Sequence, residues 1–238
     1  MIRETLFTAK EEEKATRDGF GEGIVNAGKL DDRVVALCAD LTESVRMDAF
    51  RTAFPLRYFE VGITEQAMSG VASGMASMGY IPFMASYAMF SPGRNWEQIR
   101  TTIAYNNQPV KIVGAHSGIS VGPDGATHQA LEDIALMRMI PNMQVFVPCD
   151  SVEAKLITEY IAQTKHPSYI RLTREKTPIM LPESHTFNNG KAYIMHMAHK
   201  KNGGEFIHKV GVIACGPIIY EALKASHELE KEGIGVTV

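Results

Sequence analysis

The sequence has few cysteines, and they lie far apart. Cys38, Cys149 and Cys215 are odd in number and form no Cys-x-x-Cys spacing, so the sequence indicates neither a disulfide framework nor a zinc site. This pattern is typical of a reducing compartment, and we expect a cytoplasmic protein. Residues 1–17 are rich in Glu and Lys and lack the apolar core of a signal peptide, so nothing in them indicates export.

The sequence also lacks a strong net charge. Its 24 Lys and Arg against 27 Asp and Glu give a formal net charge of −3, and no basic cluster could neutralise a row of phosphates, so we expect no nucleic-acid partner. The uncharged stretch 66–93 is long enough to raise the question of a membrane span. Serines, Gly79 and Pro82 interrupt it, so we expect it in the protein interior and expect no membrane partner.

The composition is that of an ordinary globular protein, with 238 residues of which 45% are hydrophobic and 21% charged. Short apolar runs alternate with helical patterns. We expect strands at 34–39, 58–61, 81–85, 109–114, 143–147 and 168–172. We expect helices at 9–27, 45–53, 65–78, 94–105, 131–136 and 151–163. Such buried strands between helices predict an α/β fold, a parallel sheet with helices on both faces.

A second, partial domain is expected at the C-terminal end. From about residue 181 the sequence is rich in Pro, Asn, Gly and His with little periodicity, which is typical of a linker or a loose hairpin. A strand (210–215), a helix (217–231) and a strand (235–238) follow. One such unit cannot bury its own sheet, so either this domain is truncated or another chain completes it. The expected division is given by three ranges: a first domain over 1–185, a linker over 186–204 and a partial α/β domain over 205–238.

The helix expected at 65–78 has small residues on one stripe, among them Ala67, Gly70 and Gly74. Such a stripe lets another backbone approach closely. The helix therefore packs either on its own sheet or in a subunit interface. The segment Gly19-Phe20-Gly21-Glu22-Gly23 superficially suggests a dinucleotide-binding loop, but no strand precedes it.

Two polar segments interrupt the apolar pattern. Gly62-Ile63-Thr64-Glu65-Gln66 follows an expected strand, where α/β proteins place ligands, although Glu65 could also simply favour the start of a helix. The segment 116–129 holds three glycines, His116, Asp124 and His128. Each histidine could be an ordinary loop residue, and their spacing matches no metal-binding pattern, so we expect no metal ligand in this chain.

Together these segments resemble the pyrimidine-binding domain of transketolase and related enzymes that use thiamine diphosphate. The resemblance covers about residues 10 to 180, with the motifs in the family's order and at similar spacing. The matching motifs are Cys38-Ala39-Asp40-Leu41, Gly62-Ile63-Thr64-Glu65-Gln66, the run from His116 to Gln129, Ile140-Pro141-Asn142 and Pro148-Cys149-Asp150.

The resemblance implies which residues bind the cofactor. Glu65 corresponds to the carboxyl group that hydrogen-bonds the aminopyrimidine ring and activates the cofactor. Tyr87 and Phe90 correspond to aromatic residues that line the pyrimidine pocket, and Asp40 corresponds to an acid near the thiazolium ring. A third aromatic residue common in the family would fall near Gly93 and is missing.

The resemblance also implies a site for sugar phosphates. Asp124 and His128 correspond to residues that bind substrate hydroxyls and assist proton transfer, so both are expected to be catalytic together with Glu65. Four further residues correspond to the set that binds the phosphate group of the sugar: Arg17, Ser44, His116 and Arg174.

One family motif is missing. These enzymes hold the diphosphate through a metal ion on a separate domain with a Gly-Asp-Gly motif, and this sequence has no Gly-Asp-Gly. We therefore expect half an enzyme, in which a partner chain supplies most of the contacts to Mg²⁺ (or Ca²⁺) and the diphosphate. The resemblance implies that this partner is the N-terminal-section subunit of transketolase, in a heterotetramer built on a dimer of pyrimidine domains.

The activity implied is that of a transketolase, which transfers a two-carbon ketol unit between phosphorylated sugars. A 1-deoxy-D-xylulose-5-phosphate synthase has similar motifs and remains an alternative. The β subunit of a 2-oxo acid dehydrogenase fits the split architecture but matches the segment from His116 to Gln129 poorly. A domain that only binds and supports a partner is the non-catalytic alternative.

Overall fold

The main part of the molecule is a six-stranded sheet in which all neighbouring strands are parallel. The structure, a computed structural model, describes residues 2–3, 6–7, 10–199, 206 and 208–238. In sheet order the strands are β3 (Tyr58–Glu60), β2 (Val34–Cys38), β4 (Ile81–Tyr87), β5 (Lys111–Ala115), β7 (Ser168–Arg171) and β6 (Gln144–Phe146). The expected α/β fold is confirmed.

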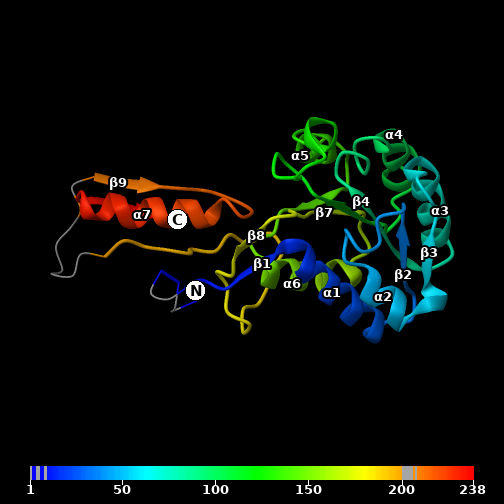
Figure 1. Ribbon diagram of the computed structural model, residues 1–238, viewed down its shortest axis with the longest axis horizontal. Coiled ribbons are helices and arrows are strands. Elements are labelled where there is room, and N and C mark those ends of the chain that lie inside the picture. Colours follow the sequence, from blue (N-terminus) through cyan, green and yellow to red (C-terminus); the bar gives the residue numbers. More distant parts are fainter. Residues whose placement is uncertain (1, 4–5, 8–9, 200–205, 207) are drawn as a thin grey trace.

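Helices cover both faces of this sheet (Figure 1). One face packs against α1 (Thr16–Leu30), α2 (Asp48–Ala53) and α6 (Ser151–Ala162). The other packs against α3 (Glu65–Ser77), α4 (Trp96–Gln98), the π-helical η2 (Ile99–Ala104) and α5 (Asp133–Arg138). In β2, Ala36 faces the first core and Leu37 the second. Both faces of the strand are buried, which explains its unbroken apolar sequence.

The glycines of α1 allow this helix to lie close to α6. A Cβ atom at Gly19 would lie 2.0 Å from the carbonyl oxygen of Ser151, and one at Gly23 would lie 2.7 Å from the Cβ of Thr158. The Gly-Phe-Gly-Glu-Gly segment therefore serves helix packing, and it lies inside α1 rather than in a nucleotide-binding loop.

The predicted start of the helix expected at 9–27 is wrong. Ala9 lies outside the described residues, and α1 begins at Thr16. Before it, β1 (Glu13–Ala15) pairs in antiparallel fashion with β8 (Lys176–Pro178). The Glu and Lys residues there favour a helix, but pairing with a distant strand overrides that local preference.

The C-terminal segment forms a small unit of its own around β9 (His208–Gly211), α7 (Ile219–Lys231) and β10 (Ile234–Thr237). The strand expected at 210–215 is misplaced, because β9 begins two residues earlier and ends at Gly211. The strands β9 and β10 are parallel, and Figure 1 shows α7 and β9 at the end of the molecule opposite α3. Residues 200–204 of the expected linker, and 205 and 207 beyond it, lie outside the described residues, and the proposed domain limits stay a prediction.

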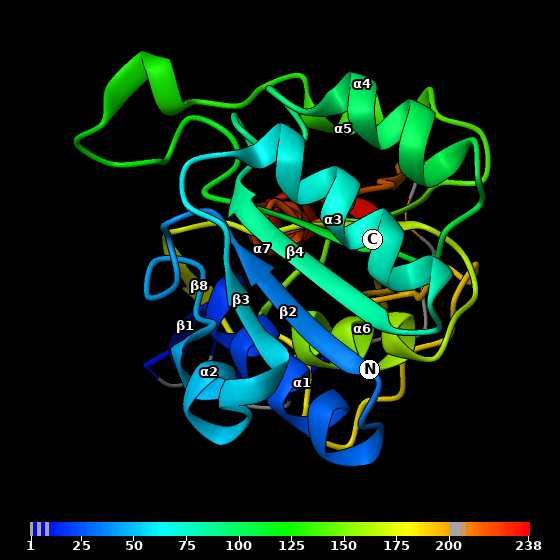
Figure 2. The same cartoon turned by 90° about the vertical axis from the view of Figure 1, so that its right-hand side faces the viewer.

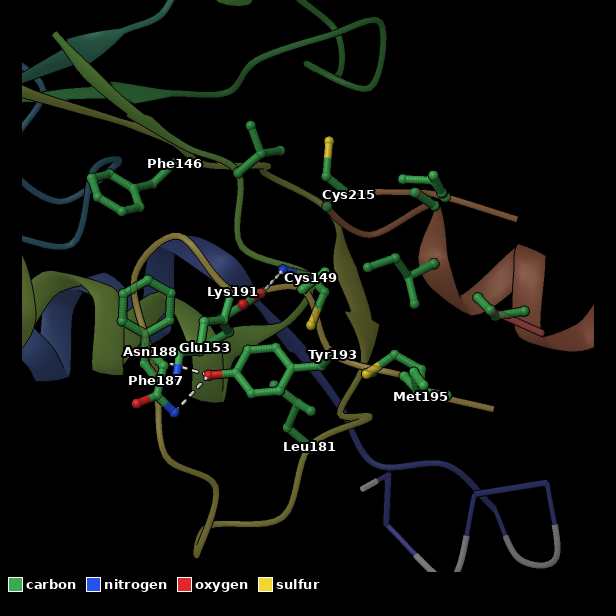
Figure 3. A pocket seen from close by; sticks show the side chains of 18 of the residues that line it. Phe146, Cys149, Glu153, Leu181, Phe187, Asn188, Lys191, Tyr193, Met195 and Cys215 are labelled. Carbon is green, nitrogen blue, oxygen red and sulfur yellow. Dashed lines mark hydrogen bonds between the residues drawn. The ribbon is translucent and has the colours of Figure 1, made fainter. Parts of the chain in front are cut away.

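A cavity of about 680 Å³ lies where this C-terminal unit meets β6 and α6. Its lining includes Phe146, Cys149, Tyr193 and Cys215, as Figure 3 shows. The residues that line it include none of the site residues expected from the sequence. This cavity is therefore separate from the candidate site described below.

The uncharged stretch 66–93 contributes most of α3 and all of β4. Among the residues that the structure describes, no helix has both the length and the apolar character needed to cross a membrane. On α3, Gly70 and Gly74 are exposed, and a Cβ atom at either would meet nothing within 4 Å. The small-residue stripe thus faces away from the chain's own sheet.

We predict that Gly19→Ala lowers the free energy of unfolding by about 1–3 kcal/mol, because the added methyl group would force α1 away from α6. The matched control is Gly74→Ala, where the space is open and the change should raise stability by up to about 1 kcal/mol. Urea unfolding of the three proteins measures both effects. Equal stability of the Gly19→Ala protein and the wild type would contradict the close packing of α1 on α6.

Candidate functional site

The polar residues singled out in the sequence follow the carboxyl ends of neighbouring strands. Asp40 follows β2, Glu65 follows β3, Tyr87 ends β4, His116 follows β5 and Arg174 follows β7. Because these strands are parallel neighbours, their carboxyl ends meet at one edge of the sheet. Figure 2 shows the arrowheads of β2 and β4 at this edge, from which the green segment around η3 (Gly125–His128) projects.

An aromatic cluster lies at this edge. The rings of Tyr87 and His116 stack with centroids 3.9 Å apart, and Phe90 lies 6.2 Å from Tyr87. The ring of His128, in η3, meets Phe90 edge-on at 5.1 Å. The structure therefore brings together the expected pyrimidine-pocket residues with two of the expected substrate residues.

His116 is held as a neutral ring. Only 3% of the residue is exposed, and Arg17 Nη1 lies 3.2 Å from its Nε2. Since a guanidinium can only donate, Nε2 is the acceptor. Burial above all, with the positive charges of Arg17 and Arg174, lowers the pKa of His116 to about 3.

The Arg17 guanidinium joins a second element of the expected phosphate site. Its Nη1 also donates to the carbonyl oxygen of Ser44 at 2.8 Å. Burial and then the charge of Arg46 lower the pKa of Arg17. Two buried atoms, Arg17 Nε and His116 Nδ1, have no hydrogen-bond partner among the described residues. Buried polar atoms normally have partners, so these two indicate a place where a polar ligand would bind.

Glu65 is buried at the first position of α3, with 1% of the residue exposed. Its Oε2 accepts a hydrogen bond from Arg94 Nη1 at 2.7 Å. The hydroxyl of Ser86 lies 3.5 Å from Oε1, which is long for a hydrogen bond. The amide of Asn95 donates to the Glu65 carbonyl oxygen at 3.1 Å and to Ser69 Oγ at 3.0 Å. The turn after Phe90 is therefore fastened to the start of α3.

Glu60, at the end of β3, was not predicted from the sequence. Its Oε1 accepts the backbone N–H groups of Asp40 at 2.7 Å and Gly62 at 3.1 Å. Asp40 has a φ of 58°, a left-handed conformation that is uncommon for a residue with a side chain. The carboxylate of Glu60 thus ties the loop after β2 to the loop after β3.

Not all expected site residues are in contact. Within the described part of the chain, Asp40, Asp124 and Arg174 make no hydrogen bond or ring contact with the other expected residues. The side chain of Arg174 donates to Glu175 at 2.6 Å, while Asp124 is exposed just before η3. These three residues lie in segments that follow the same edge of the sheet, outside the group of contacting side chains.

Comparison with known proteins identifies the family. The family model described as "Transketolase, pyrimidine binding domain" matches residues 12–180. The chain belongs to the transketolase family. The "Putative transketolase C-terminal section" of Methanocaldococcus jannaschii is 42% identical over 94% of this chain and 69% of its own length. The 6-deoxy-6-sulfo-D-fructose transketolase subunit SqwH of Clostridium sp. is 37% identical over 98% of this chain and 69% of its own length.

A solved structure of a transketolase has the same fold. It is described as a "Split gene transketolase, inactive beta4 tetramer", with a TM-score of 0.81 and 37% sequence identity. The alignment covers 95% of this chain and 71% of that one. The family membership and fold expected from the sequence are therefore both confirmed.

The described residues fit one half of the cofactor that this family uses. A buried carboxylate, linked by Arg94 to the aromatic pair of Phe90 and Tyr87, suits a flat, nitrogen-rich ring. No cluster of three or more His, Cys, Asp or Glu side chains that could hold a metal ion was found among the described residues. Glu65, Tyr87 and Phe90 thus have the chemistry that an aminopyrimidine ring would require of this chain.

We predict that His116 makes stability depend on pH. Its folded pKa of about 3 lies below the unfolded value of about 6.5, so the unfolded state binds more protons between these pH values. Stability is therefore lost as the pH falls from about 6.5 toward 3, by up to about 1.4 kcal/mol per pH unit. Urea unfolding at pH 7, 6, 5 and 4 should show a shallower loss for His116→Asn than for the wild type; equal slopes would contradict the neutral ring.

Proposed function

We propose that this chain is the pyrimidine-binding subunit of a split transketolase. With a second chain, it transfers a two-carbon ketol unit between phosphorylated sugars. The observation that carries the proposal is the buried Glu65 at the start of α3, 1% exposed, which Arg94 links to the ring of Phe90. The names of the relatives from Methanocaldococcus jannaschii and Clostridium support it, because both describe a part of a transketolase.

In this proposal each group of the site has a separate task. Thiamine diphosphate, when bound, supplies the electron sink that cleavage of a carbon–carbon bond requires. Glu65 hydrogen-bonds a ring nitrogen of the aminopyrimidine, and Tyr87 and Phe90 exclude water from the ring. Asp124 and His128 bind substrate hydroxyls, and His128 moves a proton at its ring nitrogen.

The anionic end of the sugar would bind at Arg17 and His116. Their unpartnered atoms, Arg17 Nε and His116 Nδ1, both carry a hydrogen when Nε2 of the neutral His116 ring is the acceptor, so each would donate to an oxygen of a phosphate or of a water bound to it. Guanidinium groups suit the geometry of a phosphate. Ser44 completes this site, and Arg174 joins it when its side chain leaves Glu175.

The partner chain would bind Mg²⁺ and the diphosphate, for which this chain has no Gly-Asp-Gly motif. The exposed face of α3 is the surface proposed for the contact between pyrimidine domains. Val71 is 43% exposed and Met78 is 79% exposed there, next to the open positions Gly70 and Gly74. Uncharged side chains and small residues allow close approach of a second helix. A heterotetramer with two copies of each chain follows from this arrangement.

We predict that Glu65→Gln abolishes activity without preventing assembly. The chain and its companion, copurified and identified by mass, are supplied with thiamine diphosphate, Mg²⁺ and xylulose 5-phosphate as ketol donor. The variant should turn over at least about 100-fold more slowly, because an amide cannot exchange a proton with the ring. Glu97→Gln, on the exposed side of α4, is the matched control and should keep full activity.

Two results would overturn the proposed function. Full activity of the Glu65→Gln complex would leave only the role of a supporting partner. Release of carbon dioxide from pyruvate with glyceraldehyde 3-phosphate, without ketol transfer, would instead assign the complex to the synthase.

We also predict that Val71→Glu weakens self-association. A carboxylate in the centre of the α3 face would be desolvated by a facing helix, at a cost of several kcal/mol. Leu30→Glu, an equally drastic change at the exposed end of α1 (78% exposed), is the control and should leave association unchanged. Analytical ultracentrifugation over a range of concentrations measures both, and an unchanged mass for the Val71 variant would exclude this face as the interface.

A further inference from the structure

The partner of Glu65 comes from the protein surface. Arg94 keeps 45% of its side chain exposed, while the side chain of Glu65 is 1% exposed. The arginine therefore reaches from solvent to a buried acid, and its Nη1 lies 2.7 Å from Oε2. A buried carboxylate left without a partner would be costly, so the contact stabilises the chain in this structure.

The same guanidinium lies on one of the expected pocket rings. The Cζ of Arg94 is 4.7 Å from the centroid of the Phe90 ring. Arg94 thus contacts two of the three groups that the proposed function assigns to the aminopyrimidine, the Glu65 carboxylate and the Phe90 ring. It occupies the space between the start of α3 and the turn after β4.

A guanidinium and an aminopyrimidine present similar chemistry to such a site. Both are flat, both contain carbon bonded to several nitrogens, and both can donate N–H hydrogen bonds to a carboxylate while a face lies on an aromatic ring. Glu65 Oε2 accepts a strong, charge-assisted hydrogen bond from Arg94 at 2.7 Å. While it does so, it cannot accept a hydrogen bond from an aminopyrimidine ring in the same place.

We propose that Arg94 is an internal substitute for the aminopyrimidine, and that it must release Glu65 before the cofactor can bind. This inference rests on the proposed function. The side chain is already half exposed, so it can turn into solvent without opening the core. Because only the released state binds, the apparent affinity for the cofactor is the intrinsic affinity multiplied by the fraction of molecules in that state. Arg94 therefore limits the affinity of the chain for thiamine diphosphate.

The alternative arrangement has the opposite consequence. Glu65 Oε1 has only the long 3.5 Å contact with Ser86, and a ring bound at Oε1 could leave Arg94 in place at Oε2. Arg94 would then help to hold the carboxylate in position, and its removal would weaken cofactor binding. The two arrangements thus predict affinity changes of opposite sign.

The test is the affinity of the complex of both chains for thiamine diphosphate with Mg²⁺, measured by titration calorimetry. We expect Arg94→Leu and Arg94→Gln to bind the cofactor about fivefold or more tightly than the wild type, by the population argument above. Arg100→Leu is the matched control, because Arg100 is also exposed and lies over an aromatic ring, that of Trp96 at 5.8 Å. It should bind as the wild type does.

A second measurement needs no variant and so does not depend on how a variant folds. In the wild-type complex with ¹⁵N-labelled arginine, the guanidinium signal of Arg94 should move to the position of a solvated arginine when thiamine diphosphate is added. A signal that keeps its ion-paired position, or weaker or unchanged binding by both Arg94 variants, would overturn the inference.

Failure of the proposed function gives a different result. In that case the wild-type complex would not bind thiamine diphosphate, or Glu65→Gln would bind and turn over as the wild type does. The inference about Arg94 alone fails when the wild type binds, Glu65→Gln is inactive, and the Arg94 variants show no gain in affinity.

Discussion

The common direction of the strands is the constraint on which the candidate site depends. β3, β2, β4, β5 and β7 are parallel neighbours, so every loop that follows a strand leaves from the same edge. Both faces of the sheet are packed against helices, and a shift of register by one residue would exchange the two sets of core side chains. Glu65, Tyr87 and His116 are therefore fixed relative to one another by the cores beneath them, although each lies in or next to a loop.

The sequence predicted the parts of the fold that depend on local pattern. β2, β4 and β5 were found because a strand buried on both faces is mostly apolar, even though β4 contains Ser86 and β5 begins with Lys111. The pairing of β1 with β8 could not be predicted, since Glu13–Ala15 and Lys176–Pro178 are polar and far apart in sequence. Their hydrogen bonds form only because the rest of the fold brings the two segments together. The end of β9 was also misplaced, because the strand ends at Gly211 although the N–H of Val212 still donates to the carbonyl oxygen of Thr237 at 2.8 Å.

The resemblance to the family names candidate residues of the site but says nothing of the contacts between them. The resemblance to transketolase singled out Glu65, His116 and Arg17, and in the structure Arg17 Nη1 lies 3.2 Å from His116 Nε2 although 99 residues separate them. Nothing in the local sequence indicates that Arg94 pairs with an acid 29 residues earlier, because that contact depends on how the turn after β4 folds back on α3. The support that Glu60 gives to two backbone N–H groups is likewise a property of the assembled loops.

The two ends of the proposed site differ in how their charges are balanced. At the phosphate end, Arg17 Nε and His116 Nδ1 are buried and have no partner within the described chain, so the protein already bears the cost of desolvating them. At the cofactor end, Arg94 satisfies the carboxylate of Glu65. A ligand at the phosphate end would therefore add hydrogen bonds to atoms that have no partner, whereas a ligand at Glu65 must first replace an existing hydrogen bond. In the proposed site, binding at the phosphate end thus requires only that Arg174 leave Glu175, whereas binding of the cofactor requires that Arg94 release Glu65.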